Sequence, residues 1–181
     1  TIPPNVVIIC EKAFQLCESL KEVNISEDSK LDLIDEESFT EIDIEKIFIP
    51  ASVTKINGFA FHKCKNLSNV TFQSNSKLSM IGTCAFSFTN VRNIQIPEKV
   101  TIIDESSFGG SLNIFSFEFL GEKLMMKSYC FEDSIKMILA SFPNAKEIAL
   151  SHFTFINVSK DISFFFLPGA KIAQDDAIIY N

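Results

Sequence analysis

A long-range repeat constrains the fold of this chain more than any other feature of its sequence. Pro3, Pro50 and Pro97 follow one another at intervals of 47 residues. Phenylalanines recur between and after them at steps that alternate between 25 and 22 residues, namely Phe14, Phe39, Phe61, Phe86 and Phe108. A period in the twenties predicts a solenoid, in which each coil buries its apolar face against its neighbours. We therefore expect stacked coils of two alternating lengths.

One short strand is predicted in each coil. Apolar residues recur with the spacing i, i+3, i+5, and the last two of each set point to one side of a strand. About twenty residues separate successive sets, so parallel pairing is favoured over hairpins. The sets are Leu20-Val23-Ile25, Ile44-Ile47-Ile49, Leu67-Val70-Phe72, Val91-Ile94-Ile96 and Leu112-Phe115-Phe117, followed by Ala145-Ile148-Leu150 and Ile162-Phe165-Leu167.

The recurring phenylalanines are the predicted core of the solenoid. In the best-preserved copy, Ala60 precedes Phe61. The small residue lets the backbone approach, and the ring fills the interior. Equivalent rings in neighbouring coils should stack, each contributing roughly 1.5–3 kcal/mol by burial.

The C-terminal third of the sequence is less regular. Residues 133–141 read as a short helix with Asp133 as N-cap and with Ile135, Ile138 and Leu139 on one side, and Pro143 is expected to end it. Residues 167–178 resemble one further repeat, and no polar capping segment is apparent after Ile178. We interpret residues 1–181 as a single solenoid with regular coils over 2–117 and degenerate coils over 118–181. Because residue 1 lies in mid-repeat, the chain is interpreted as part of a longer array.

Composition argues against several classes of function. The net charge of −7, from 16 Lys+Arg and 23 Asp+Glu, disfavours binding to nucleic acid. The longest apolar runs are too short to span a membrane. The acidic clusters Asp35-Glu36-Glu37 and Asp175-Asp176 are expected at solvated turns, and no hydrolase, phosphate-loop or zinc-protease motif is present. The sequence predicts neither an enzyme nor a cofactor.

The cysteines and histidines do not form a recognisable framework. Five cysteines make an odd number, and Cys17 and Cys64 hold the same repeat position two coils apart, beyond disulfide reach. We expect both to be small buried hydrophobes. His62 and Cys64 have only His152 as a further histidine, so a zinc site is not predicted.

The combined pattern resembles the BspA-type leucine-rich repeat. Residues 2–20 and 49–67 both follow the order Ile-Pro, Val, Ile, Ala-Phe, Cys, Leu, with good register over 2–117. The resemblance implies an α/β-type repeat solenoid that is strand-rich overall. Its parallel β-sheet would line the concave face, and its return segments would be irregular or short helical and 3-10 turns. It also implies a non-catalytic protein at the cell surface or secreted, used for adhesion to host matrix or cell-surface proteins.

The outward-facing strand residues are the candidate binding residues. They lie between the inward anchors and are polar near the centre of the predicted face. Toward the C-terminal end the same rule places Ile114, Phe164 and Phe166 outward, either as anchors for a partner or as residues covered by a further coil. The predicted ligand-binding set is Glu22, Asn24, Lys46, Phe48, Asn69, Thr71, Asn93 and Gln95.

Two alternatives to an adhesin remain open at the level of sequence. The unpaired cysteines are consistent with an intracellular leucine-rich-repeat scaffold, and a structural spacer in a longer surface array would need no ligand. Four Asn-x-Ser/Thr triplets begin at Asn24, Asn66, Asn69 and Asn157. They are either glycan acceptors on a secretory route or chance occurrences in a composition rich in these residues.

Overall fold

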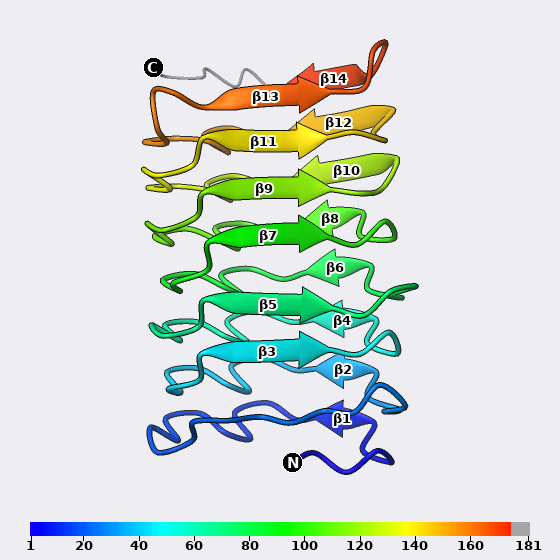
Figure 1. Cartoon of the computed structure of the whole chain (residues 1–181), viewed down its shortest axis with the longest axis vertical. Helices are drawn as coiled ribbons and strands as arrows, with labels where there is room; N and C mark the ends of the chain where they lie inside the picture. The colour runs from blue at the N-terminus through cyan, green and yellow to red at the C-terminus, as the bar shows by residue number, and fades with distance from the viewer. Residues whose placement is uncertain (175–181) are drawn as a thin grey trace.

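The chain forms a stack of coils that alternate between a back strand and a front strand, except that residues 22–25 at the front of the first coil form no strand (Figure 1). This computed structural model describes residues 1–174. The predicted segment that reaches Ile178 and the acidic pair Asp175-Asp176 lie partly or wholly outside the described residues. Over residues 1–174 the solenoid contains strands and turns but no helix, so no helix there could cross a membrane.

The strands belong to two groups. The back sheet is continuous, with eight parallel strands in the order β1-β2-β4-β6-β8-β10-β12-β14. They span Ile8–Ile9, Leu33–Ile34, Lys55–Ile56, Met80–Ile81, Ile102–Ile103, Lys123–Met126, Glu147–Leu150 and Lys171–Gln174. The front strands β3, β5, β7, β9, β11 and β13 span Lys46–Ile49, Asn69–Phe72, Asn93–Ile96, Ser116–Phe119, Leu139–Phe142 and Ser163–Phe166.

The solenoid, the parallel pairing and the strand-rich character are confirmed, but the α/β description is wrong because the return segments contain no helix. Residues predicted to be helical at 133–141 instead form turns that lead into β11. Asp133 has a φ of 61°, incompatible with a right-handed helical turn, and Leu139 pairs with Ser116 and Ser163 on either side. Pairing with the neighbouring coils therefore overrides the local helical pattern.

Three of the predicted strand registers are also wrong. The fifth strand uses Phe117 and Phe119 as inward residues, whereas Leu112 and Phe115 are exposed. The set ending at Leu150 forms a strand, but β12 lies in the back sheet rather than the front sheet. In both places a second i, i+3, i+5 set lies a few residues away, so the spacing alone did not choose between them. In the last set, β13 turns Phe164 and Phe166 toward the core, whereas the predicted anchor Phe165 is exposed.

The alternation of 25 and 22 residues arises at two places in a coil. Across the turn from front to back strand, Ile81 follows Phe72 by nine positions, but Ile103 follows Ile96 by only seven. The coil with the 25-residue step also has one more residue between its phenylalanine and its front strand than the coil with the 22-residue step. The segment from each back strand to its phenylalanine has constant length, which keeps the rings in register.

The predicted phenylalanine stack is present and extends further than the sequence indicated. Successive rings lie nearly parallel, with centroids 5.1–5.5 Å apart. Phe61 is fully buried between Phe39 and Phe86. The members are Phe14, Phe39, Phe61, Phe86, Phe108, Phe131 and Phe155.

The turns around this stack use the left-handed backbone region twice in each coil. Bonds between coils hold them in place, for example from the Phe61 amide to the Ala85 carbonyl at 2.8 Å. Glycine occupies such a position in one coil, at Gly110, with a φ of 69°. Elsewhere residues with side chains bear the steric cost of φ near +55°. The two columns are Lys12, Glu37, Phe59, Cys84, Ser106, Tyr129 and Phe153, and Leu16, Glu41, Lys63, Phe88, Gly110, Asp133 and Asn157.

Candidate functional site

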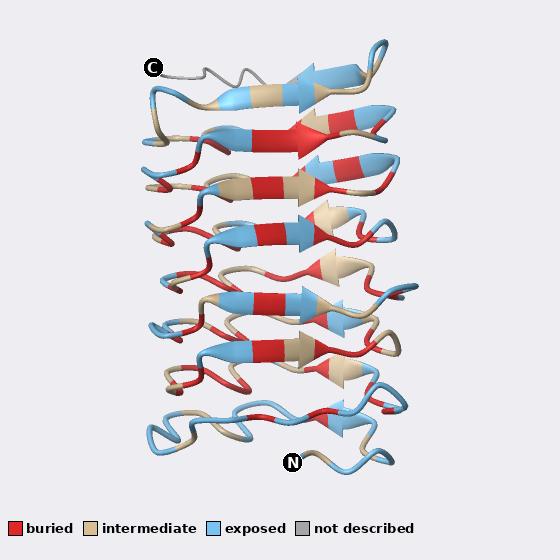
Figure 2. Ribbon diagram, in the orientation of Figure 1, coloured by how far each residue is buried: buried red, intermediate tan, exposed pale blue. Residues whose placement is uncertain are grey.

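Most of the residues predicted to face outward do so. Buried and exposed residues alternate along the front strands (Figure 2), as expected for a sheet with one face on the core. Phe48 is half-buried, and the other seven members of the predicted set are exposed, namely Glu22, Asn24, Lys46, Asn69, Thr71, Asn93 and Gln95.

The C-terminal part of the predicted face needs correction. Ile114 is fully buried, and Phe164 and Phe166 pack against the core rather than facing outward. Phe115 and Phe165 are exposed instead, at 51% and 55%. The signal for the fifth coil was available, because Leu67 follows Phe61 by six residues and the same interval from Phe108 gives Ile114.

The front sheet is interrupted between β5 and β7, and we call this junction the seam. Strands β3 and β5 form one sheet, and β7, β9, β11 and β13 form another. At one end of each pair within these sheets, Gln73 N–H donates to Ile49 C=O at 3.0 Å, and Leu120 N–H donates to Ile96 C=O at 3.1 Å. The equivalent donor for the Phe72 carbonyl would be residue 97, which is proline.

Two sequence features together account for the seam. Pro97 has no N–H, so it removes the last bond of a ladder between β5 and β7. Val91 follows Phe86 by only five positions, whereas Ile114 follows Phe108 by six. Strand β11 shows that proline alone is insufficient. Pro143 follows it, but its approach has six residues and three of its residues still pair with β9.

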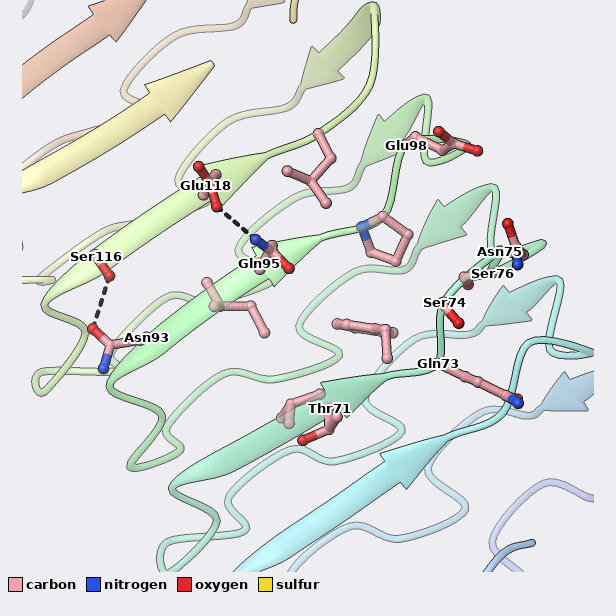
Figure 3. A pocket seen from close by; sticks show the side chains of 15 residues that line it. Thr71, Gln73, Ser74, Asn75, Ser76, Asn93, Gln95, Glu98, Ser116 and Glu118 are labelled. Carbon is pink, nitrogen blue, oxygen red and sulfur yellow. Dashed lines mark hydrogen bonds between the residues drawn. The ribbon is translucent and has the colours of Figure 1, made fainter. Parts of the chain in front are cut away.

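An open hollow of about 700 Å³ lies over the seam. Figure 3 shows that its polar side chains come from β5, β7, β9 and the turns that follow β5 and β7. Thr71, Asn93 and Gln95 belong to the predicted ligand-binding set, which does not include the other lining residues. The two extra residues between Phe72 and Ile81 were a usable signal. The further polar lining residues are Gln73, Ser74, Asn75, Ser76, Glu98, Ser116 and Glu118.

Side-chain hydrogen bonds tie each side of the hollow to its own sheet. Gln95 Nε2 donates to Glu118 Oε2 at 2.6 Å, and Ser116 Oγ donates to Asn93 Oδ1 at 2.7 Å. On the other side, Gln73 Oε1 accepts a bond from the Ala51 amide at 2.7 Å. Among the described side chains, no hydrogen bond joins β5 to β7 in Figure 3. The arrangement leaves a polar depression between two internally braced halves.

A serine–histidine contact lies in the turns beside the phenylalanine stack. His62 Nδ1 is 2.6 Å from Ser87 Oγ, and that hydroxyl donates to the Cys84 carbonyl at 2.9 Å. Burial, followed by the charge on Lys63, lowers the pKa of His62. Ser87 is 1% exposed. These bonds fix the turn and leave the serine oxygen inaccessible from the surface.

All five cysteines are free thiols. Burial raises the pKa of Cys64 to about 12, and its Sγ contacts the Phe39 carbonyl. The expectation of burial is therefore confirmed for Cys64. It is wrong for Cys17, which is exposed in the first coil. Within residues 1–174, no group of three or more His, Cys, Asp and Glu side chains is placed to hold a metal ion.

Comparison with known proteins identifies the repeat. The sequence model of a family described as BspA type leucine rich repeat region matches the chain in 6 copies, over residues 1–114 and 79–177. No match was found among the curated proteins.

Solved structures with similar folds come from three bacteria. The pneumococcal vaccine antigen PcpA is 16% identical, with a TM-score of 0.54 over 96% of this chain. The chain spans 41% of that structure. A leucine-rich repeat protein from Bacteroides ovatus is 20% identical, with a TM-score of 0.47, over 98% of this chain and 56% of that structure. A leucine rich cell surface protein from Faecalibacterium prausnitzii is 16% identical, with a TM-score of 0.49, over 90% of this chain and 58% of that structure.

Proposed function

The chain belongs to the BspA-type leucine-rich-repeat family, and we propose that it is a non-catalytic module that binds another protein through its front strands. The observation that supports this most directly is the convergence of polar residues from three successive front strands around one hollow. Solenoids bind through extended faces made by equivalent residues of successive repeats. We further propose that the binding residues are Glu22, Asn24, Lys46, Phe48, Asn69, Thr71, Asn93 and Gln95.

The proposed location is the cell surface or the extracellular medium, and the proposed partner is a host matrix or cell-surface protein. This part of the proposal rests on what the family resemblance implies. PcpA, which shares the fold, is described as a vaccine antigen. The cell-surface role would make the chain an adhesive segment of a longer protein.

The binding face can be tested by replacing four front residues together. The variant Lys46→Ala/Phe48→Ala/Asn69→Ala/Asn93→Ala should abolish attachment of protein-coated beads to cultured epithelial cells. A matched variant changes four back-strand residues, Lys55→Ala/Lys123→Ala/Met125→Ala/Glu147→Ala, of which all but Met125 are charged and all are exposed.

Circular dichroism and thermal melting should first establish that both variants remain folded. Attachment that survives in the folded front variant, or is lost equally in the back variant, would contradict the proposed face. Loss in the front variant alone would support it.

A second candidate is an intracellular scaffold, because five free thiols suit a reducing compartment. Protease treatment of intact source cells distinguishes the two locations. Digestion of the segment without lysis supports the surface protein, whereas protection until lysis supports the scaffold.

A further inference from the structure

We propose that the hollow over the seam receives a cationic side chain, an arginine or a lysine, carried by an extended segment of the partner protein. This inference rests on the proposed function and names the chemistry of the partner at one place on the front face. It follows from the balance of hydrogen-bond donors, acceptors and charges around β5 and β7.

The backbone of the seam leaves one acceptor, the Phe72 carbonyl, without a ladder partner. Gln73 and the other odd-numbered residues of this segment form backbone hydrogen bonds with β3. Alternate residues of a strand point to opposite neighbours, so the carbonyl groups of the even-numbered residues of β5 point toward β7. Phe72 is one of these seam-facing residues. Pro97 stands where its donor would be, so the Phe72 carbonyl has no counterpart to the bond that Ile96 receives from Leu120.

Two carboxylate side chains add negative charge and further hydrogen-bond acceptors to the hollow. Glu98 and Glu118 both line the hollow, and none of its lining residues is a lysine, arginine or histidine. Gln95 donates to Oε2 of Glu118, which holds the carboxylate in place and leaves Oε1 to accept from a ligand. An arginine carries five donors and no acceptor, and a lysine carries three, so either would complement this lining.

A second hollow on the same face explains why the seam is preferred. That hollow is lined by Lys21, Glu22, Asp43, Glu45, Lys46 and Asn66. Its carboxylate Asp43 is already paired with Lys21 and accepts a bond from Asn66. A cation arriving there would compete with a lysine of the chain itself. Over the seam, neither Glu98 nor Glu118 has an ion-pair partner among the described residues.

The geometry favours a side chain presented by an extended segment. The hollow crosses from β5 over β7 to β9, which corresponds to about 10 Å at the usual strand spacing. It opens on the front face, where Asn93 of its lining and the nearby Asn69 of β5 are exposed. A segment lying across the strands can place one long side chain in the hollow and contact these amides with its backbone.

The experiment is a titration of the ¹⁵N-labelled chain, followed by NMR, with N-acetyl-arginine amide as probe. The matched probe is N-acetyl-citrulline amide, which keeps the shape and loses the charge. The arginine probe should give saturable shifts at the amides of Thr71, Gln95 and Glu118, and citrulline should bind at least tenfold more weakly.

Two variants make the test specific. Glu98→Gln/Glu118→Gln should weaken binding of the arginine probe at least tenfold. Glu105→Gln/Glu147→Gln removes the same charge from exposed positions outside the hollow and should leave binding unchanged. Equal binding of both probes, or equal effects of both variants, would overturn the proposal.

Failure here is distinguishable from failure of the proposed function. If the arginine probe does not bind at the seam but the front variant still loses cell attachment, the front face binds its partner by other chemistry. If the probe binds as expected, the cationic specificity stands whatever the attachment assay shows.

Discussion

The front and back of the solenoid use the same parallel pairing, yet only the back sheet runs unbroken. Eight back strands pair in one order from β1 to β14, whereas the front strands divide into β3-β5 and β7-β9-β11-β13. The back strands are as short as two residues, and the front strands have four. Strand length therefore does not decide continuity.

The difference shows where a repeat protein tolerates variation. Each back strand from β1 to β12 precedes its phenylalanine by a constant interval, so it remains in register with the stack. Front strands are reached through segments of variable length and are left through proline in alternate coils. Pro50, which follows β3, likewise occurs together with a short approach from Phe39 to Ile44, and residues 22–25 of the preceding coil form no strand. The core carries stability, and the front face is where the coils differ.

The largest expected effect on stability comes from disrupting the phenylalanine stack, the part of the core that the front and back sheets share. Phe61→Ala should lower the free energy of unfolding by about 3–5 kcal/mol, because it opens a cavity between the rings of Phe39 and Phe86. Phe115→Ala removes a ring that is 51% exposed and should cost less than about 1 kcal/mol. Urea denaturation of both variants measures the difference. Similar losses would mean that the stack is not the common support.

An intermediate effect is expected in the turns that connect the two sheets. Leu16 is 57% exposed and has a φ of 58°, so Leu16→Gly relieves left-handed strain and removes less buried surface than the same change at a core leucine. It should raise the free energy of unfolding by about 0.5–1 kcal/mol. Glu22→Gly, at an exposed residue outside the left-handed set, should instead lower it. Thermal melting of the two variants measures both changes. If both glycine substitutions were destabilising, this interpretation would be contradicted.

The smallest change in stability is expected at the seam itself. Pro97→Ala supplies an N–H opposite the Phe72 carbonyl, a gain of about 1 kcal/mol that the freer unfolded chain largely offsets. The net change should be within about 0.5 kcal/mol, but the new amide should be protected from hydrogen exchange. Pro143→Ala serves as control, since β9 and β11 already pair. An unprotected amide at position 97 would show that the short approach alone holds the seam open.

The repeat predicted the solenoid, the phenylalanine stack and four of the front registers, because burial at a fixed interval leaves a strong signal. It did not predict the back sheet, whose two-residue strands are too short to show a period. It also misplaced the strand at Leu139, where local helical spacing competes with pairing to neighbouring coils. Thr71, Asn93 and Gln95 were correctly placed on the surface.

The repeat spacing did not predict the seam between β5 and β7, although the causes of the seam are visible in the sequence. The missing donor at Pro97 and the short approach after Phe86 act only when two coils are compared side by side. A single-coil pattern treats each strand as equivalent to the others. The carboxylate of Glu118 was likewise hidden, because the fifth strand was placed two residues too early.

Native-state hydrogen exchange tests the interruption of the front sheet most directly. Gln95 directs its amide toward the seam, whereas Glu118 directs its amide toward the paired strand β7. The Gln95 amide should exchange at least tenfold faster than that of Glu118, while amides of β10 and β12 in the back sheet should remain protected. Equal protection at Gln95 and Glu118 would show that β5 and β7 are paired in solution and would contradict the account.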